Sequence, residues 1–175
     1  SCVNALSEHL EAIVYREGKV YQQKYSRGKA LEPVAEIGTT EERGTQVTFK
    51  PDHQIFDNLV YSYDTLANRM RELSFLNKGI TITMTDKREK DDDGEFKTEV
   101  FHSEEGLKEF VRYIDETREQ LIGDVISMEG EKNGIPVEVA MTYNTSYAEN
   151  IHSYVNNINT HEGGTHLSGF RRGLT

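Results

Sequence analysis

Apolar and polar side chains alternate with a period of two through much of the first third of the chain, a pattern that is typical of strands. Residues 11–17 and 19–26 are rich in Val, Ile and Tyr and lie on either side of Gly18, which predicts a β-hairpin. The Ala, Leu and Glu content of residues 4–10 predicts a short helix before that hairpin. We therefore expect the chain to begin with a helix and two antiparallel strands.

The middle of the chain changes from strand to helix periodicity. Residues 33–37 predict a weak strand, and residues 45–49 predict a stronger one that ends before Pro51. Residues 63–77 predict an amphipathic helix, because apolar residues recur there at helical spacing. Those residues are Leu66, Met70, Leu73 and Leu76.

Residues 86–95 form a charged run, DKREKDDDGE, which contains no hydrophobic residue. Such a run is typical of a solvated loop, and the pattern of elements starts again after it, so it is the best candidate for a domain boundary. Strands are expected on both sides, over residues 80–85 and 96–101. The later elements expected are a helix at 104–118, a hairpin at 124–131 and 135–143 around an Asn-Gly turn, a strand at 151–158, and a helix after the glycine turn at 163–164.

The predicted fold is therefore α+β with mostly antiparallel hairpins, in two unequal parts that cover residues 1–90 and 96–175. The first part has a few strands and two helices, and its first helix has nothing before it to pack against. We interpret this as a piece cut from a longer protein.

Charge narrows the range of partners. The chain carries 20 basic and 30 acidic side chains, a net charge of −10, and such a surface repels nucleic acid on average. Any contact with DNA would be local, and the pair Arg171 and Arg172 is one candidate patch. The alternative is that both are solvated arginines on a terminal helix.

The sequence indicates neither a membrane-spanning helix nor a disulfide framework. No apolar run approaches the roughly 20 residues that a membrane helix needs, and no targeting segment is present. The single Cys2 excludes an internal disulfide framework. A cytoplasmic protein is expected.

The histidines do not fall at metal-ligand spacing, so no metal site is predicted. His161 and His166 are the nearest pair, five residues apart, and zinc would need further ligands at defined positions. The turn that they flank, HEGGTH, is better explained by glycine backbone geometry than by chemistry. No Walker A or G-x-G-x-x-G motif is present, so these patterns alone leave the function unstated.

Several separate blocks of sequence, taken together, carry a family resemblance. They are VNALSEHLEAIVYREGKVYQQKYSRG, GTTEERGTQVTFKPDHQIFDN, LANRMRELSFLNKGITITMTDKR, NGIPVEVAMTYN and NNINTHEGGTHLSGFRRGLT. In this order they resemble the B subunits of bacterial DNA gyrase, members of the GHKL ATPase family. The related B-type subunits of topoisomerase IV share the outline.

The resemblance implies a specific fold class. Residues 1–90 would be the C-terminal part of a GHKL-type ATPase sandwich that lacks its N-terminal half. Residues 96–175 would be the N-terminal part of a transducer domain with a left-handed βαβ crossover.

The resemblance also implies an incomplete ATP site. Ser1 and Asn4 would stand at the start of a phosphate-binding helix, directly after a glycine-rich lid. The family's general-base Glu, its Mg²⁺-holding Asn and its adenine-reading Asp would all precede this segment. No catalytic residue is therefore expected in the chain, which should bind neither ATP nor Mg²⁺ and should be inactive alone, although the full-length protein would use both.

Four residues carry family roles outside the phosphate end. Thr45 would help to bind the adenine edge through a water, and Val47 would form an apolar wall of the same pocket. Arg16 would stand at the pocket rim, where coumarin inhibitors bind, and its alternative is an ordinary surface arginine on a strand. Arg171 would face the cavity through which DNA passes.

The function implied is that of an ATP-dependent type II topoisomerase subunit that introduces negative supercoils into DNA. Its partners would be DNA and the gyrase A protein in a heterotetramer, with the isolated segment a monomer or held in a non-native contact. The alternatives are a topoisomerase IV protein, which prefers decatenation, and a stand-alone module that binds a protein partner.

Overall fold

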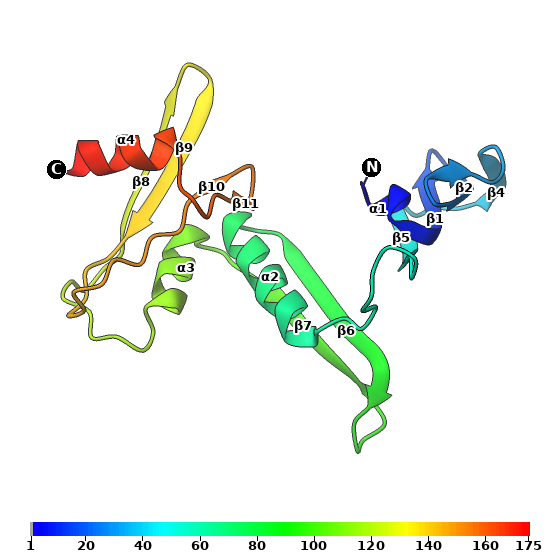
Figure 1. Ribbon diagram of the computed structural model, residues 1–175, viewed down its shortest axis with the longest axis horizontal. Coiled ribbons are helices and arrows are strands. Elements are labelled where there is room, and N and C mark those ends of the chain that lie inside the picture. Colours follow the sequence, from blue (N-terminus) through cyan, green and yellow to red (C-terminus); the bar gives the residue numbers. More distant parts are fainter. Residues whose placement is uncertain (1) are drawn as a thin grey trace. The chain divides into compact units, whose positions relative to one another are not determined.

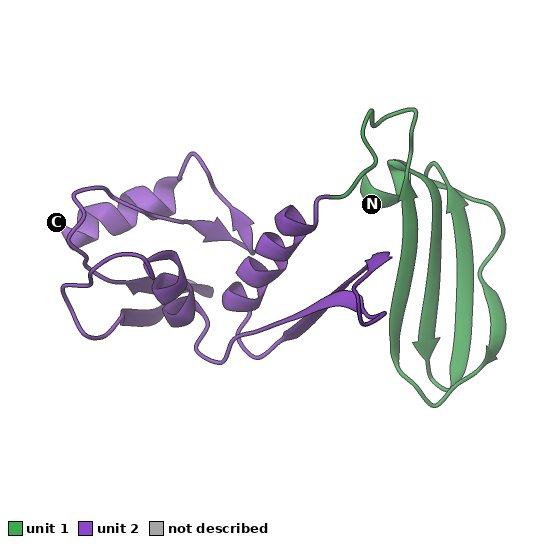
Figure 2. Cartoon of the chain, turned by 90° about the horizontal axis from the view of Figure 1, so that it is seen from below, with its two compact units in different colours: residues 1–61 green, residues 62–175 purple. Residues whose placement is uncertain are grey.

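The computed structural model describes residues 2–175, which form two compact units that divide after residue 61; they are called unit 1 and unit 2 (Figures 1 and 2). Ser1, one of the residues predicted to contact ATP, lies outside the described part. No helix among the described residues is long and apolar enough to cross a membrane.

Unit 1 is an antiparallel sheet with one short helix at its start (Figure 2). The strand order is β3-β2-β1-β5, and β4 shares the outer edge of β2 with β3. The elements are α1 (Cys2–Ala5), β1 (Ser7–Arg16), β2 (Lys19–Ser26), β3 (Lys29–Ala30), β4 (Ala35–Thr39) and β5 (Gly44–Pro51). The predicted hairpin is confirmed, and Glu17 and Gly18 at its turn have φ angles of 54° and 79°, which suit a tight two-residue turn.

The predicted helix over residues 4–10 is wrong beyond Ala5. The Ser7 hydroxyl donates to the Val3 carbonyl at 2.6 Å, and the chain then enters β1, where Leu10 pairs with Tyr25 on one side and with Phe49 on the other. Pairing with two neighbouring strands outweighs the modest helix propensity of these residues, because propensity is only a weak prior.

Unit 2 consists of helices and three two-stranded ladders, β6-β7, β8-β9 and β10-β11. The elements are α2 (Tyr63–Leu76), β6 (Thr81–Lys90), β7 (Phe96–His102), α3 (Leu107–Ile114), β8 (Ile126–Lys132), β9 (Ile135–Met141), β10 (Tyr154–Val155), β11 (Ile158–Asn159) and α4 (Thr165–Leu174). Phe75 of α2 stacks on Phe110 of α3, with ring centroids 5.2 Å apart. Ala67, Phe101, Phe110 and Val125 are its buried hydrophobic residues among those described.

The charged run does not divide the compact units. β6 extends through it to Lys90 and pairs with β7, so that Thr83 faces Val100 and Asp86 faces Lys97. Only residues 91–95 form the loop, and the units instead divide after residue 61. The division into family domains at residues 1–90 and 96–175 therefore stays a prediction. It does not coincide with the division between the two compact units.

Two further elements of unit 2 differ from expectation because of backbone geometry. The helix predicted over residues 104–118 is shorter, since Gly106 precedes it with a φ of 60°. The strand predicted over residues 151–158 is broken by Asn156 and Asn157, whose φ angles of 50° and 64° turn the chain between β10 and β11. The α+β class is confirmed, and every ladder among the described residues is antiparallel, so the βαβ crossover is not among the observed pairings.

Candidate functional site

One face of the unit 1 sheet brings together three of the predicted site residues. Val14 of β1 faces Thr45 of β5, and Ala12 faces Val47. Directly opposed residues share a face, and so do residues two apart on one strand. Arg16, two residues after Val14, therefore lies on the same face as Thr45 and Val47.

This face is open in the described structure. Val47 is 54% exposed and Phe49 is 44% exposed, although side chains on a sheet face are ordinarily packed against another layer. Its neighbours on β2 are Tyr21, Gln23 and Tyr25, which oppose Val14, Ala12 and Leu10. The face thus offers apolar and aromatic surface beside a hydroxyl and a cation, a combination that suits a flat ligand with polar edges.

Arg16 stands at the edge of this face. Its side chain is 69% exposed, and its Nε donates to Glu17 at 2.9 Å. An exposed pair between neighbouring residues fixes little, so the guanidinium is free to turn toward a ligand. This geometry fits both the rim role and the alternative of a surface arginine.

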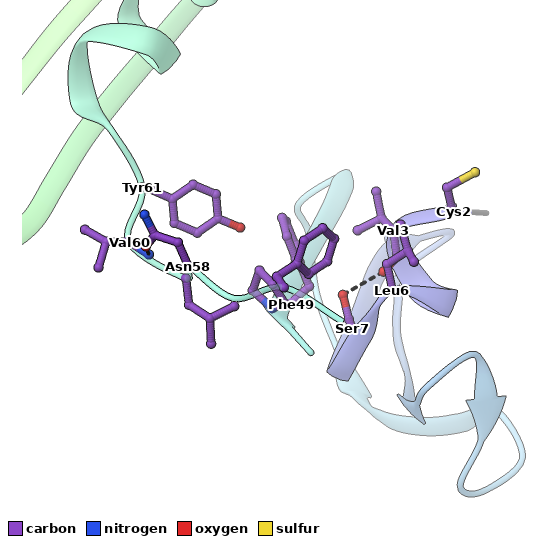
Figure 3. A pocket seen from close by; sticks show the side chains of 11 residues that line it. Cys2, Val3, Leu6, Ser7, Phe49, Asn58, Val60 and Tyr61 are labelled. Atoms are coloured by element: carbon purple, nitrogen blue, oxygen red, sulfur yellow. Dashed lines mark hydrogen bonds between the residues drawn. The ribbon is translucent and has the colours of Figure 1, made fainter. Parts of the chain in front are cut away.

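An apolar hollow of about 320 Å³ lies at the other end of the same face (Figure 3). Phe49, next along the face after Thr45 and Val47, lines it together with Val3 and Leu6 of the N-terminal segment. Tyr61 and Val60 close it from the end of unit 1. The sequence patterns did not predict this hollow, because it forms where the first and last segments of unit 1 meet.

Asn4 lies at this second end of the sheet, away from Thr45. It belongs to α1, which packs beside the start of β1 and the end of β5. Its side-chain oxygen Oδ1 is buried and has no protein partner among the described residues. The structure therefore separates Asn4 from Thr45 by about six strand residues, or roughly 20 Å along the sheet.

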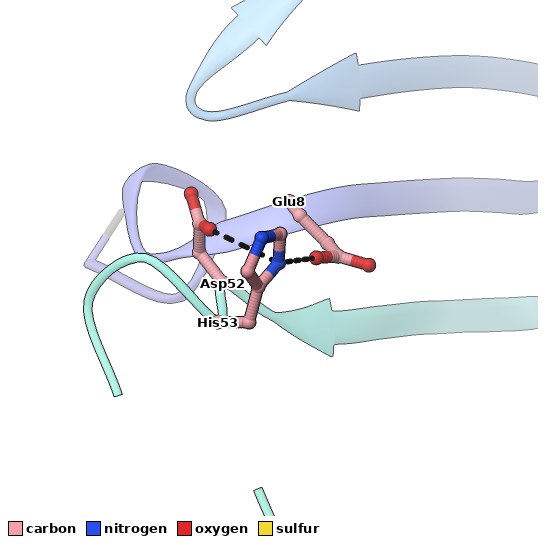
Figure 4. A group of neighbouring side chains, drawn as sticks. All are labelled: Glu8, Asp52 and His53. Atoms are coloured by element: carbon pink, nitrogen blue, oxygen red, sulfur yellow. Dashed lines mark hydrogen bonds and ion pairs between the residues drawn. The ribbon is translucent and has the colours of Figure 1, made fainter. Parts of the chain in front are cut away.

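Glu8, Asp52 and His53 form the one cluster of metal-type ligands in the described residues (Figure 4). The ring of His53 lies 2.7 Å from a Glu8 oxygen. Both carboxylates are already paired with cationic side chains, since Arg27 Nε contacts Asp52 at 2.5 Å and Lys50 Nζ contacts Glu8 at 2.5 Å. We interpret the cluster as an ion-pair network at the end of the sheet.

Hydrogen bonds from cationic neighbours lower the pKa values of these two carboxylates. Asp52 is 1% exposed, and its hydrogen bonds from Arg27 and from the Gln54 amide hold its pKa below the ordinary value. Lys50, and to a lesser extent His53, lower the pKa of Glu8. The network therefore stays ionised and joins β1, the turn after β2 and the end of β5.

The remaining predicted residues lie in unit 2. Arg171 is on α4, and its guanidinium contacts Glu149 at 2.8 Å while staying half exposed. His166 is 3.3 Å from the hydroxyl of Thr160, and neither it nor His161 joins a metal-ligand cluster in the described part of the chain. Arg171 is thus partly neutralised, and its contact with DNA stays a prediction.

Comparison with known proteins gives consistent matches. A family model described as DNA gyrase B matches residues 106–175. The DNA gyrase B protein of Cytophaga aurantiaca is 61% identical over the whole chain, which spans 37% of that relative, and the gyrase B protein of Halalkalibacterium halodurans is 52% identical, with 27% of its length spanned. The chain thus spans between 27% and 37% of the length of these relatives.

Solved structures match the fold along nearly the whole chain. The 43K ATPase domain of Thermus thermophilus gyrase B, in complex with an aminocoumarin, has a TM-score of 0.82 and 34% identity, and the match covers 97% of this chain and 45% of that one. The gyrase B protein of Myxococcus xanthus has a TM-score of 0.83 over 97% of this chain and 48% of that one. At 23% identity, this second match supports the fold alone.

Proposed function

The chain belongs to the DNA gyrase B family, and from that premise we propose that it forms one wall of the ATP pocket of a type II DNA topoisomerase. The single observation that carries the proposal is the strand register of β1 and β5. It sets Arg16, Thr45 and Val47 on one exposed sheet face, where the family resemblance requires an adenine pocket and its rim.

The two ends of this wall suit the two ends of a nucleotide. Thr45 offers a hydroxyl for the polar edge of the adenine, and Val47 offers an apolar contact for its ring. Asn4, in α1 at the far end of the sheet, takes the phosphate side, and Ser1 completes that side in the proposal. Catalytic groups and the ligands of Mg²⁺ come from parts of the protein outside residues 1–175.

The whole protein would use ATP and Mg²⁺ to drive DNA strand passage in the cytoplasm, together with DNA and a gyrase A protein. Arg171 on α4 is the proposed local contact for DNA, since its guanidinium is half exposed on a chain that is otherwise acidic. The isolated chain is proposed to be a monomer with no ATPase activity. The relatives named above are gyrase B proteins, which favours supercoiling over the decatenation of a topoisomerase IV.

The first test measures ATP turnover by the 175-residue chain. We expect no hydrolysis above background with Mg²⁺, because proton transfer and charge stabilisation need groups that this segment does not supply. Measurable turnover by the purified chain would refute the proposal that catalysis depends on other segments.

The second test places Thr45→Ala in the longer protein that contains this chain. Loss of one hydrogen bond is expected to weaken ATP binding by about 3–10-fold. Gln46→Ala is the matched control, because Gln46 is the exposed neighbour on the opposite face of β5 and should leave ATP affinity unchanged. Equal effects of the two variants, measured by calorimetric titration, would contradict the assignment of this face.

The third test separates the rim from the pocket. Arg16→Ala should weaken the binding of an aminocoumarin, the class of ligand bound to the Thermus thermophilus domain, more than it weakens the binding of ATP. Arg43→Ala, in the exposed loop before β5, is the control. Unchanged aminocoumarin affinity in the Arg16 variant would contradict the rim role and favour the alternative that Arg16 is an ordinary surface arginine.

A further inference from the structure

The turn between β8 and β9 places an asparagine side chain beside a glycine backbone nitrogen at an exposed position. Asn133 and Gly134 form this turn with φ angles of 55° and 75°, and Lys132 pairs with Ile135 across it. Both angles are left-handed, as a two-residue type I′ turn requires, and Asn-Gly is a preferred pair for such a turn. The turn lies at the tip of the hairpin (Figure 1), and both of its residues are exposed.

The two groups of this turn that can react with each other are not held by hydrogen bonds. In the part of the chain that the structure describes, neither the Gly134 amide nor the Asn133 side chain takes part in one. A Cβ added at Gly134 would meet no atom within 4 Å. Gly94 follows Asp93 in another exposed turn, but its amide donates to the Asp91 carbonyl at 3.0 Å. Of these two glycine nitrogens, that of Gly134 is therefore the one available as a nucleophile.

We propose that Asn133 is a site of spontaneous deamidation. The Gly134 nitrogen loses its proton and bonds to Asn133 Cγ, the bond from Cγ to Nδ2 breaks, and ammonia leaves with a proton from water, which gives a five-membered cyclic imide. Water then adds to one of the two imide carbonyls and breaks its bond to nitrogen, so the product is aspartate or isoaspartate. Nothing is oxidised or reduced, and water is the only co-reactant. Glycine favours the first step because it has no side chain to obstruct the approach of its nitrogen.

The chain contains a second turn of similar geometry in which the reaction is disfavoured. Asn156 and Asn157 join β10 to β11, with φ angles of 50° and 64°, close to the values in the first turn. The residue after Asn156 carries a side chain, and that residue is anchored. The side-chain amide of Asn157 donates to Asn77 Oδ1 at 2.8 Å, and its carbonyl accepts from Arg69 at 2.7 Å. Asn156 is therefore an internal control for an exposed asparagine in the same kind of turn.

Deamidation at this position should weaken the tip of the β8-β9 hairpin. The residues of β9 from Ile135 to Glu138 are exposed, and the chain becomes half-buried only from Val139 onward. The turn and the ladder therefore hold the tip without help from burial. Isoaspartate inserts an additional carbon into the main chain, which no longer fits the two-residue turn that fixes the register of the strands. Either product also adds a negative charge two residues from Glu131.

The test incubates the folded 175-residue chain at mildly acidic, neutral and mildly alkaline pH and measures the peptides that contain Asn133 and Asn156 by mass spectrometry. The mass change from amide to acid should accumulate several-fold faster at Asn133, and it should accelerate as the pH rises, because the attacking nitrogen must lose its proton. Equal rates at the two positions would overturn the proposal. Conversion of Asn133 only in chain unfolded with urea would also overturn it, since the folded turn would then block the reaction.

The variant Asn133→Gly tests the consequence for the hairpin. Gly-Gly also suits a type I′ turn and leaves no side-chain amide to react. Hydrogen exchange of residues 126–141 should lose protection as the unaltered chain ages and should stay constant in the variant, with residues 7–26 of unit 1 as the internal reference. An equal decline in both proteins would overturn the role of Asn133. Constant protection in unaltered chain that has become deamidated would overturn the weakening of the tip.

Discussion

Unit 1 and unit 2 are stabilised in opposite ways. Unit 1 is one continuous sheet with a single buried hydrophobic residue among those described, Leu10, and its buried charge is Asp52, paired with Arg27. Unit 2 has three separate two-stranded ladders, and aromatic side chains join its helices. Backbone pairing and an ion pair thus maintain unit 1, whereas side-chain packing maintains unit 2.

The difference explains where the proposed functions lie. A sheet held by its own ladder can leave one face open, and the face with Thr45 and Val47 is exposed. Unit 2 leaves many apolar residues exposed, such as Val137, but it buries Phe101 and Phe110, and aromatic stacking joins α2 to α3. The following predictions test this contrast, from the largest expected effect to the smallest.

Phe110→Ala should cause the largest effect, and only in unit 2. Phe110 is 8% exposed and stacks on Phe75, and truncation of a buried Phe typically costs about 3–5 kcal/mol. Hydrogen exchange measured by mass spectrometry should show lost protection in unit 2 and unchanged protection in unit 1. Tyr147→Ala is the control, since Tyr147 is fully exposed. An equal loss of protection in both units would contradict the proposed difference in how the two units are stabilised.

Asp52→Asn should have the next largest effect, in unit 1. The substitution leaves Arg27 without its carboxylate partner, and we expect the unfolding temperature of unit 1 to fall by roughly 5 °C. Asp57→Asn, at an exposed position of the same unit, should change it by less than a degree or two. If both variants unfold alike, the ion pair does not maintain the sheet end.

Acidification should weaken unit 1 through the same network. The pKa of Asp52 is lowered mainly by Arg27, and that of Glu8 mainly by Lys50. Their stabilisation is therefore complete above the ordinary carboxyl pKa values, near 4, and is lost as the pH falls through the lower folded-state values. Asp86 of unit 2 has its pKa lowered to about 2 by Arg88, but this exposed pair should contribute little.

Amide exchange of each unit measured between pH 5 and pH 2 checks this pH dependence. Protection of unit 1 should decline below pH 4, and the decline should be shallower in Asp52→Asn. An equal decline in the variant would assign the acid sensitivity to other groups.

Arg16→Ala should have the smallest effect on folding. Its side chain is mostly exposed and contacts only the adjacent Glu17, so the free energy of unfolding should change by less than about 0.5 kcal/mol. Arg27→Ala is the contrast within the same sheet and should destabilise unit 1 clearly. A large loss of stability in the Arg16 variant, measured by urea denaturation, would mean that this proposed rim residue also stabilises the sheet.

Local pattern was sufficient for much of the fold. The hairpins at Glu17-Gly18 and at Asn133-Gly134 and the helix from Tyr63 to Leu76 agree with prediction. Turn geometry and side-chain periodicity act over a few residues, so they can be interpreted without knowledge of the rest of the molecule. The separated sequence blocks also carried the family, and with it the residues of the proposed pocket.

By itself, then, the sequence determined the hairpins, the amphipathic helix and the family; only the tertiary structure decided where those pieces meet. Strand pairing on both sides of β1 turned residues 7–10 from a predicted helix into a strand. Asp52 meets Arg27 across 25 positions, and Asp115 meets Asn144 across 29. Burial and ion pairing depend on neighbours brought together by the chain path, which a local pattern does not contain.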